Sequence, residues 1–173
     1  MTKVSFENNI IIFGFATKSE LKEMIQHETG KSVFADLTCY DPAEFYQEFP
    51  QLKGSFSALF CNDTKKIEIH FREKNDAVKN KFQELGFSLV ETTIVSIGFV
   101  FPRTIAQIIN EAHYALAEKV ASREDIDRAM KFGVNYPKGP FEWSAGKEII
   151  VKTLLHVLYE KTQDKRYIAS DLL

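Results

Sequence analysis

Hydrophobic residues follow two different patterns along this chain, and the change falls near residue 97. Before it, short apolar runs alternate with stretches of helical periodicity, whereas after it every apolar series repeats at helical spacing. We therefore predict an α/β domain at 1–97 and an all-α domain at 98–173, with no low-complexity linker between them.

Five strands are predicted in the first domain. The run IIIFGFA at 10–16 is continuously apolar, which is typical of a strand buried on both faces. The other predicted strands are SVFADL (32–37), SFSALFC (55–61), KIEIHF (66–71) and SLVETTIV (88–95). With the helices between them they give the order β-α-β-α-β-β-α-β, which favours a small α/β domain with a partly parallel sheet.

Polar residues mark the helix starts of this domain. Thr17 and Glu20 form a capping-box sequence that opens a helix, and Gly30 is placed to end it. Asp41, followed by Pro42 at the first helical position, opens a second helix. A third helix is predicted from Asn75/Asp76 to Gly86, and NDTK (62–65) is predicted as a turn.

The second domain is predicted to be helical throughout. A helix at 99–120 carries one apolar stripe, and the capping sequence SRED (122–125) opens a shorter helix that closes at Gly133. Gly139–Pro140 opens a long helix running to about residue 161, and Asp164 caps the start of the tail. Because the apolar residues of 148–160 are too widely spread for one stripe, we expect that helix to be covered on more than one side.

Between two of these helices lies the segment GVNYPKGPFEW (133–143), which combines backbone-fixing residues with aromatic side chains. Prolines fix φ and glycines permit unusual φ, so the path of this elbow is predicted to be stiff. Two interpretations are open, a ligand-facing site and a rigid joint packing helix 99–120 against helix 140–161, and we favour the joint. The elbow residues are Gly133, Tyr136, Pro137, Gly139, Pro140, Phe141 and Trp143.

Composition narrows the classes of function. The chain has 173 residues, is 45% hydrophobic and 27% charged, and carries a net charge of −2, as ordinary soluble proteins do. Without a basic excess in either half, we expect no nucleic-acid binding. The N-terminus lacks a signal-peptide core, and no apolar run approaches the roughly 20 residues of a membrane span, so we expect a cytoplasmic protein. Cys39 and Cys61 are expected to be reduced and buried.

Two common nucleotide-binding sequences are missing. Dinucleotide binding needs G-x-G-x-x-G after the first strand, but the segment there is GFATKSE, where Gly14 is the only glycine and Phe15 and Lys18 take the place of small residues. A G-x-x-x-x-G-K-[ST] phosphate loop is also missing. We therefore expect no nucleotide cofactor.

The positions of the histidines do not predict a catalytic or metal-binding site. His70 lies two residues from Glu68 on a strand and could form a relay with it, although a partly exposed pair of neighbours is the simpler interpretation. His113 and His156 are predicted on solvated helix faces. No histidine or cysteine spacing predicts a metal site.

The residues of 98–173 resemble the C-terminal helical domain of the 3-hydroxyacyl-CoA dehydrogenases. The similarity runs through GFVFPR, INEA, VASREDIDRAM, YPKGPFEW and the tail RYIASDLL. It implies a helical domain of the 6-phosphogluconate dehydrogenase C-terminal type. Residues 1–97 resemble the last third of that family's NAD domain, as a truncated, degenerate Rossmann-like remnant. The whole chain is similar to the second half of the long bacterial members.

The resemblance implies NAD-dependent oxidation of 3-hydroxyacyl-CoA to 3-ketoacyl-CoA in fatty-acid metabolism, but the matching residues differ. Leu59 takes the place of the family's general-base histidine, and Pro102 that of its catalytic asparagine. Thr38 is the hydroxyl candidate for its serine, and Glu68 matches its histidine-orienting glutamate. A leucine cannot accept a proton, so we predict no catalytic residue and no autonomous dehydrogenase activity.

The family's helical domain forms much of a dimer interface and closes the acyl-CoA cleft. By resemblance we expect a homodimer, or docking onto a catalytic dehydrogenase subunit, and an accessory role that includes acyl-CoA binding. The alternatives are a structural or binding module that has left the pathway, and an active dehydrogenase with unusual residues. The substrate-binding candidates are Glu68, Arg103, Asn110 and Phe141.

Overall fold

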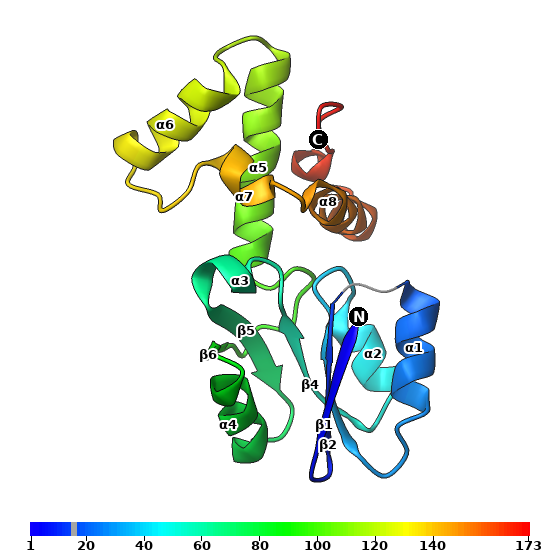
Figure 1. The fold of residues 1–173 in the computed structure, drawn as a ribbon. Helices are drawn as coiled ribbons and strands as arrows, with labels where there is room; N and C mark the ends of the chain where they lie inside the picture. The colour runs from blue at the N-terminus through cyan, green and yellow to red at the C-terminus, as the bar shows by residue number, and fades with distance from the viewer. Residues whose placement is uncertain (15–16) are drawn as a thin grey trace. The chain divides into compact units, whose positions relative to one another are not determined.

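The computed structural model describes residues 1–14 and 17–173, and the chain forms two compact units, Met1–Pro102 and Arg103–Leu173 (Figure 1). The division falls slightly after the change of hydrophobic pattern at residue 97.

The first unit is built on a six-stranded sheet with the strands in chain order. Strands β2, β3 and β4 run parallel to one another, as do β5 and β6, while the pairs β1–β2 and β4–β5 are antiparallel. The partly parallel sheet predicted from the sequence is thus confirmed. The strands are β1 (Thr2–Phe6), β2 (Asn9–Phe13), β3 (Ser32–Asp36), β4 (Leu52–Ser57), β5 (Lys66–Phe71) and β6 (Ser88–Glu91).

Strand β1 was not predicted. It pairs with β2 from Thr2↔Phe13 to Phe6↔Asn9, and Glu7 turns the hairpin with a φ of 46°. Only Val4 and Phe6 of β1 pack on the core, so its hydrophobic signal is weak. In β2, by contrast, Ile10–Ile12 are fully buried, as a strand covered on both faces should be. The predicted extension of β2 through residues 15 and 16 lies outside the described residues.

Helices cover both faces of this sheet. Helices α1 (Lys18–Gln26) and α2 (Pro42–Glu48) pack on one face and α4 (Asp76–Glu84) on the other (Figure 1). The predicted caps are confirmed at Thr17, Asp41 and Asn75, whose side chains accept backbone N–H groups of the first turn.

Several predicted boundaries of this unit were wrong. Helix α1 ends at Gln26 instead of near Gly30, and the predicted turn NDTK belongs to a short helix, α3 (Cys61–Thr64). Strand β4 begins and ends earlier than 55–61. Strand β6 stops at Glu91 instead of 95, because its last pairing partner is Ile69, near the end of β5. Cys39 and Cys61 are buried and form no disulfide within the described residues, which agrees with the expected reduced thiols.

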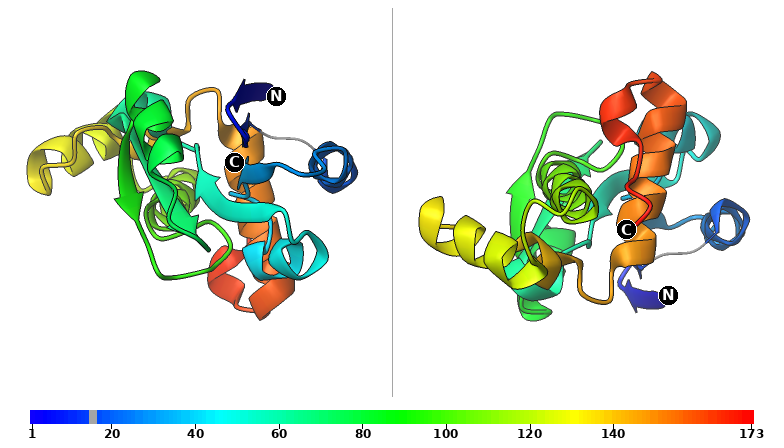
Figure 2. Two further views of the ribbon diagram at one scale, coloured as in Figure 1. Left: turned by 90° about the horizontal axis from the view of Figure 1, so that it is seen from below. Right: turned by 90° about the horizontal axis from the view of Figure 1, so that it is seen from above.

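The second unit is helical, as predicted. Its elements are α5 (Phe101–Ala117, which starts just before the division), α6 (Arg123–Gly133), α7 (Pro140–Ser144), α8 (Glu148–Thr162) and the 3-10 turn η1 (Lys165–Tyr167). Ser122 caps α6 and Asp164 caps η1, as predicted. Figure 2, which looks along α5, shows α8 running across α5 instead of alongside it. In the described part of the chain no helix is both long and apolar enough to cross a membrane.

The single long helix predicted from residue 140 is two helices. Gly146 has a φ of +71°, a left-handed conformation that ends α7 before α8 begins. The apolar residues of α8 also divide: Val151, Leu154, Leu155 and Leu158 form one buried stripe, while Ile149 is 83% exposed. Part of the wide apolar surface of this helix is therefore uncovered within the chain.

Candidate functional site

The predicted elbow lies between α6 and α7 and is held by an aspartate from α6. Asp127 Oδ1 accepts the Phe141 N–H at 2.9 Å, which satisfies a free donor in the first turn of α7. Gly139 makes this approach possible, because a Cβ at that position would lie 2.2 Å from Asp127 Cγ. Glu142 closes the turn by accepting the Gly139 N–H at 3.1 Å and pairing with Lys131 of α6.

Phe141, a predicted substrate contact, is buried at the centre of this joint. Its ring meets the His113 ring of α5 edge-on, with centroids 4.9 Å apart, and the Arg123 guanidinium of α6 lies 4.6 Å from its centroid. Phe141 therefore joins α5, α6 and α7. Trp143 is also buried, whereas Tyr136 is only partly buried.

His113 does not lie on a solvated helix face, so that prediction was wrong. The residue is 1% exposed, and its Nδ1–H donates to the Ile109 carbonyl at 2.8 Å. Burial lowers the pKa of His113 and Arg123 adds to that effect, whereas the hydrogen bond to the Ile109 carbonyl and the charge of Glu148 oppose it. His156 is exposed, as predicted.

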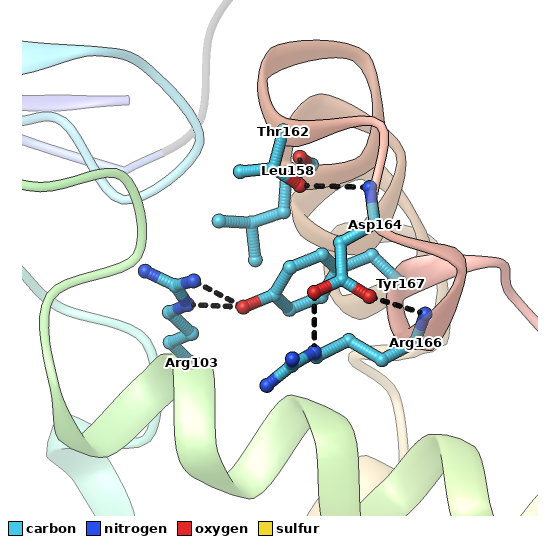
Figure 3. A network of polar contacts seen from close by, with 6 residues as sticks. All are labelled: Arg103, Leu158, Thr162, Asp164, Arg166 and Tyr167. Atoms are coloured by element: carbon cyan, nitrogen blue, oxygen red, sulfur yellow. Dashed lines mark hydrogen bonds and ion pairs between the residues drawn. The ribbon is translucent and has the colours of Figure 1, made fainter.

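Arg103, the second predicted substrate contact, is bound to the C-terminal tail. The Tyr167 hydroxyl accepts the Arg103 Nε–H at 2.8 Å and a second guanidinium N–H (Figure 3), and the guanidinium carbon lies 5.0 Å from the centroid of the Tyr167 ring. Tyr167 itself is 3% exposed. Figure 3 also shows Asp164 capping the turn that carries Tyr167, with its carboxylate paired to Arg166.

Asn110, the third candidate, also binds the C-terminal tail, at residues 168 and 170. Its Nδ2 donates to the Ile168 carbonyl at 2.7 Å and its Oδ1 accepts the Ser170 N–H at 2.8 Å. Both polar atoms of the side chain are thereby hydrogen-bonded, and the residue is 1% exposed. Arg103 and Asn110 thus clamp residues 167–170 onto α5.

Glu68, the fourth candidate, caps a helix. Its Oε2 accepts the N–H groups of Phe101 at 2.8 Å and Val100 at 3.2 Å, at the start of α5. Burial raises the pKa of Glu68, while these two hydrogen bonds oppose the rise. His70 does not form the considered relay with Glu68; its Nδ1 is hydrogen-bonded to the Tyr46 hydroxyl at 3.0 Å. Binding of substrate by the four candidates stays a prediction.

A buried polar cluster at the end of β3 was missed as a unit. Thr38 donates its N–H and O–H to Asp36 Oδ1, at 3.1 and 2.6 Å, and Ser57 donates its hydroxyl to Thr38 Oγ1 at 2.7 Å. Asp36 is 3% exposed, its Oδ2 lacks a hydrogen-bond partner within the described residues, and burial raises its pKa to about 6. The only sequence signal was Thr38, whose hydroxyl is fully occupied here.

The N-terminus of α1 is closed by its own capping box. There the Glu20 carboxylate accepts both the N–H and the O–H of Thr17, at 2.9 and 2.7 Å. These two donors at the helix start are therefore already used. Among residues 1–14 and 17–173, no group of three His, Cys, Asp or Glu side chains could hold a metal ion.

The second unit of this chain is similar to a domain of known proteins. Residues 98–173 match the family model for the 3-hydroxyacyl-CoA dehydrogenase C-terminal domain. The 3-hydroxyadipyl-CoA dehydrogenase of Escherichia coli K12 is 47% identical over 78 residues, 44% of this chain and 16% of that protein. The 3-hydroxybutyryl-CoA dehydrogenase of Clostridioides difficile is 41% identical over 80 residues, 45% of this chain and 28% of that protein.

One solved structure extends the likeness to both units. The (S)-3-hydroxybutyryl-CoA dehydrogenase of Ralstonia eutropha superposes with a TM-score of 0.73 at 21% identity, over 94% of this chain and 62% of that chain. The fold of the two units is therefore a Rossmann-like sheet followed by a helical domain. Residues 98–173 are thus similar to the C-terminal domain of the 3-hydroxyacyl-CoA dehydrogenases. It spans only part of the length of these relatives.

Proposed function

We propose that this chain is a non-catalytic accessory member of the 3-hydroxyacyl-CoA dehydrogenase family, in which a degenerate Rossmann-like domain at 1–97 precedes a dimerising helical domain at 98–173. The observation that carries the proposal is the use of Glu68. The glutamate that resembles the family's histidine-orienting residue caps α5 here, and the buried Leu59 stands where the histidine would be. An orienting carboxylate without a histidine cannot support proton abstraction.

The absence of turnover is tested with purified protein, NAD and 3-hydroxybutyryl-CoA, by following NADH absorbance. We expect no rate above a no-enzyme control, and Leu59→His alone should not restore one, because the start of α1 is occupied by Glu20. Turnover of about 1 per second, near the low end for ordinary enzymes, would refute the proposal.

Dimerisation is supported by α6. The helix contains no buried residue, and Phe132 and Val134 at its C-terminal end are 82% and 56% exposed. Figure 1 shows α6 standing away from α8, so the helical unit itself does not cover it. A second copy of this chain would bury such surfaces in a two-fold interface.

Sedimentation velocity at micromolar concentration should therefore give a dimer. Phe132→Glu should give a folded monomer with an unchanged circular dichroism spectrum, whereas Glu124→Gln on the exposed start of the same helix should leave the dimer intact. A wild-type monomer would contradict the proposal.

Acyl-CoA binding belongs to the proposed accessory role and is inferred from the resemblance to the family. A ligand that binds only the folded state raises the melting temperature, so a thermal-shift screen with NADH, CoA and acetoacetyl-CoA tests it. A shift with acetoacetyl-CoA and none with NADH supports an acyl-CoA-binding accessory half. No shift with any of them favours the alternative, a structural module outside the pathway.

A further inference from the structure

Phe141 lies between two groups that carry, or can acquire, positive charge. The His113 ring meets it edge-on at 4.9 Å, and the Arg123 guanidinium is 4.6 Å from the same ring. Such a stack is favourable while one partner is cationic and the other neutral. A proton on His113 would place two like charges around one buried ring.

The surroundings of His113 cannot readily accommodate that proton. The residue is 1% exposed, so a cationic ring would lose most of its hydration, and the hydrogen bond that Nδ1–H donates to the Ile109 carbonyl offsets only part of that loss. Arg123 of α6 opposes the charge, and Glu148 at the start of α8 favours it. From α7 the packed group is the neutral Phe141 ring, whose charged neighbour Glu142 is paired with Lys131.

We propose that His113 is an acid sensor for the helical joint: when His113 takes up a proton, the Phe141 stack opens and the α6–α7 segment loosens from α5. The attachment of α6 runs through this joint, by Arg123 to Phe141, Asp127 to the Phe141 N–H, and Lys131 to Glu142. Loss of the central ring contact therefore weakens the anchorage of a helix that has no buried residue of its own.

The direction of the pH effect on stability follows from the difference in proton binding between the folded and unfolded states. The folded state holds the pKa of His113 below its ordinary value, so the unfolded chain binds more protons on acidification. The stability of this unit is therefore complete above the ordinary histidine pKa of about 6.5 and falls as the pH drops below it.

The chain contains a built-in reporter, because its single tryptophan, Trp143, is buried in α7 beside this stack. Melting curves are recorded by Trp143 fluorescence at about pH 7.5 and about pH 5.5, the range in which histidine titrates. We expect a lower melting temperature at the acidic pH in the wild type and in the exposed-histidine control His156→Gln. The acid-induced difference should disappear in His113→Leu.

Two exposed or partly exposed charges give an independent test should His113→Leu fail to fold. Arg123→Gln removes the cation that opposes the protonated state and should make the acid-induced difference smaller. Glu148→Gln removes the charge that favours it and should make the difference larger. Changes of opposite sign, independent of protein concentration, support the proposal. An acid-induced difference that persists in His113→Leu, or is the same in Arg123→Gln and Glu148→Gln, overturns it.

Discussion

Gly139→Ala probes the joint between α6 and α7 at its closest contact. A Cβ at residue 139 would lie 2.2 Å from both Cγ and Oδ1 of Asp127, far inside van der Waals contact. Asp127 can relieve the overlap only by moving, and its Oδ1 then leaves the Phe141 N–H. Loss of such a cap costs about 1 kcal/mol, and residual overpacking adds about 1–3 kcal/mol, so we expect a loss of roughly 2–4 kcal/mol.

Gly133→Ala is the matched control, because no atom lies within 4 Å of a Cβ built there. Alanine at this helix-terminal position should leave stability unchanged or raise it by up to about 1 kcal/mol. Urea unfolding followed by Trp143 fluorescence measures both variants. Asp127→Ala should recover most of the steric part of the Gly139→Ala cost in a double-mutant cycle. Equal stabilities of Gly139→Ala and Gly133→Ala would refute the reasoning.

Three further predictions follow from contacts in the two units. Because the folded-state pKa of Asp36 is raised, the first unit should lose roughly 2–3 kcal/mol of unfolding free energy as the pH rises from about 4 to about 6, and Asp36→Asn should abolish this loss. Urea unfolding followed by far-UV circular dichroism measures the loss, and an unchanged pH profile in the variant would contradict the prediction. Tyr167→Phe leaves Arg103 without its acceptor and should cost about 1.5–3 kcal/mol by thermal unfolding, whereas Tyr159→Phe on α8 should cost less than about 0.5 kcal/mol. Leu155→Glu should unfold the helical unit and Ile149→Glu should leave it folded by circular dichroism, since the first side chain is fully buried and the second is 83% exposed; the reverse order would contradict the packing of α8.

Local chemistry explains which elements could be predicted. Thr17, Asp41, Asn75, Ser122 and Asp164 each satisfy backbone donors within their own first turn, so their sequence signals carry the full cause. Strand β1 and the end of β6 depend instead on what lies beside them in the sheet. A strand with only two core contacts, or one whose partner ends, has no signature in its own residues.

The contacts of the candidate site residues were harder to predict from the sequence for the same reason. Arg103 and Asn110 were singled out by resemblance, but their partners are a tyrosine and backbone groups more than fifty residues away. His113 lies beside polar residues in sequence, and its ring packs against Phe141, a contact that its own surroundings in the sequence do not reveal. Asp127, which holds the joint, gave no signal in its own sequence surroundings, because Gly139 is twelve residues away and the Phe141 N–H that it binds is fourteen residues away.

The N-terminal hairpin has a consequence for solubility. Strand β2 reads NIIIF, with no charge and no proline, and β1 covers one of its hydrogen-bonding edges. Short uncharged segments of this kind, once their edges are open, stack into cross-β aggregates. Strand β1 contributes little to the core but keeps this edge of β2 paired, which prevents another chain from pairing with it. Removal of residues 1–7 is therefore expected to yield a chain that aggregates before it loses its remaining folded structure.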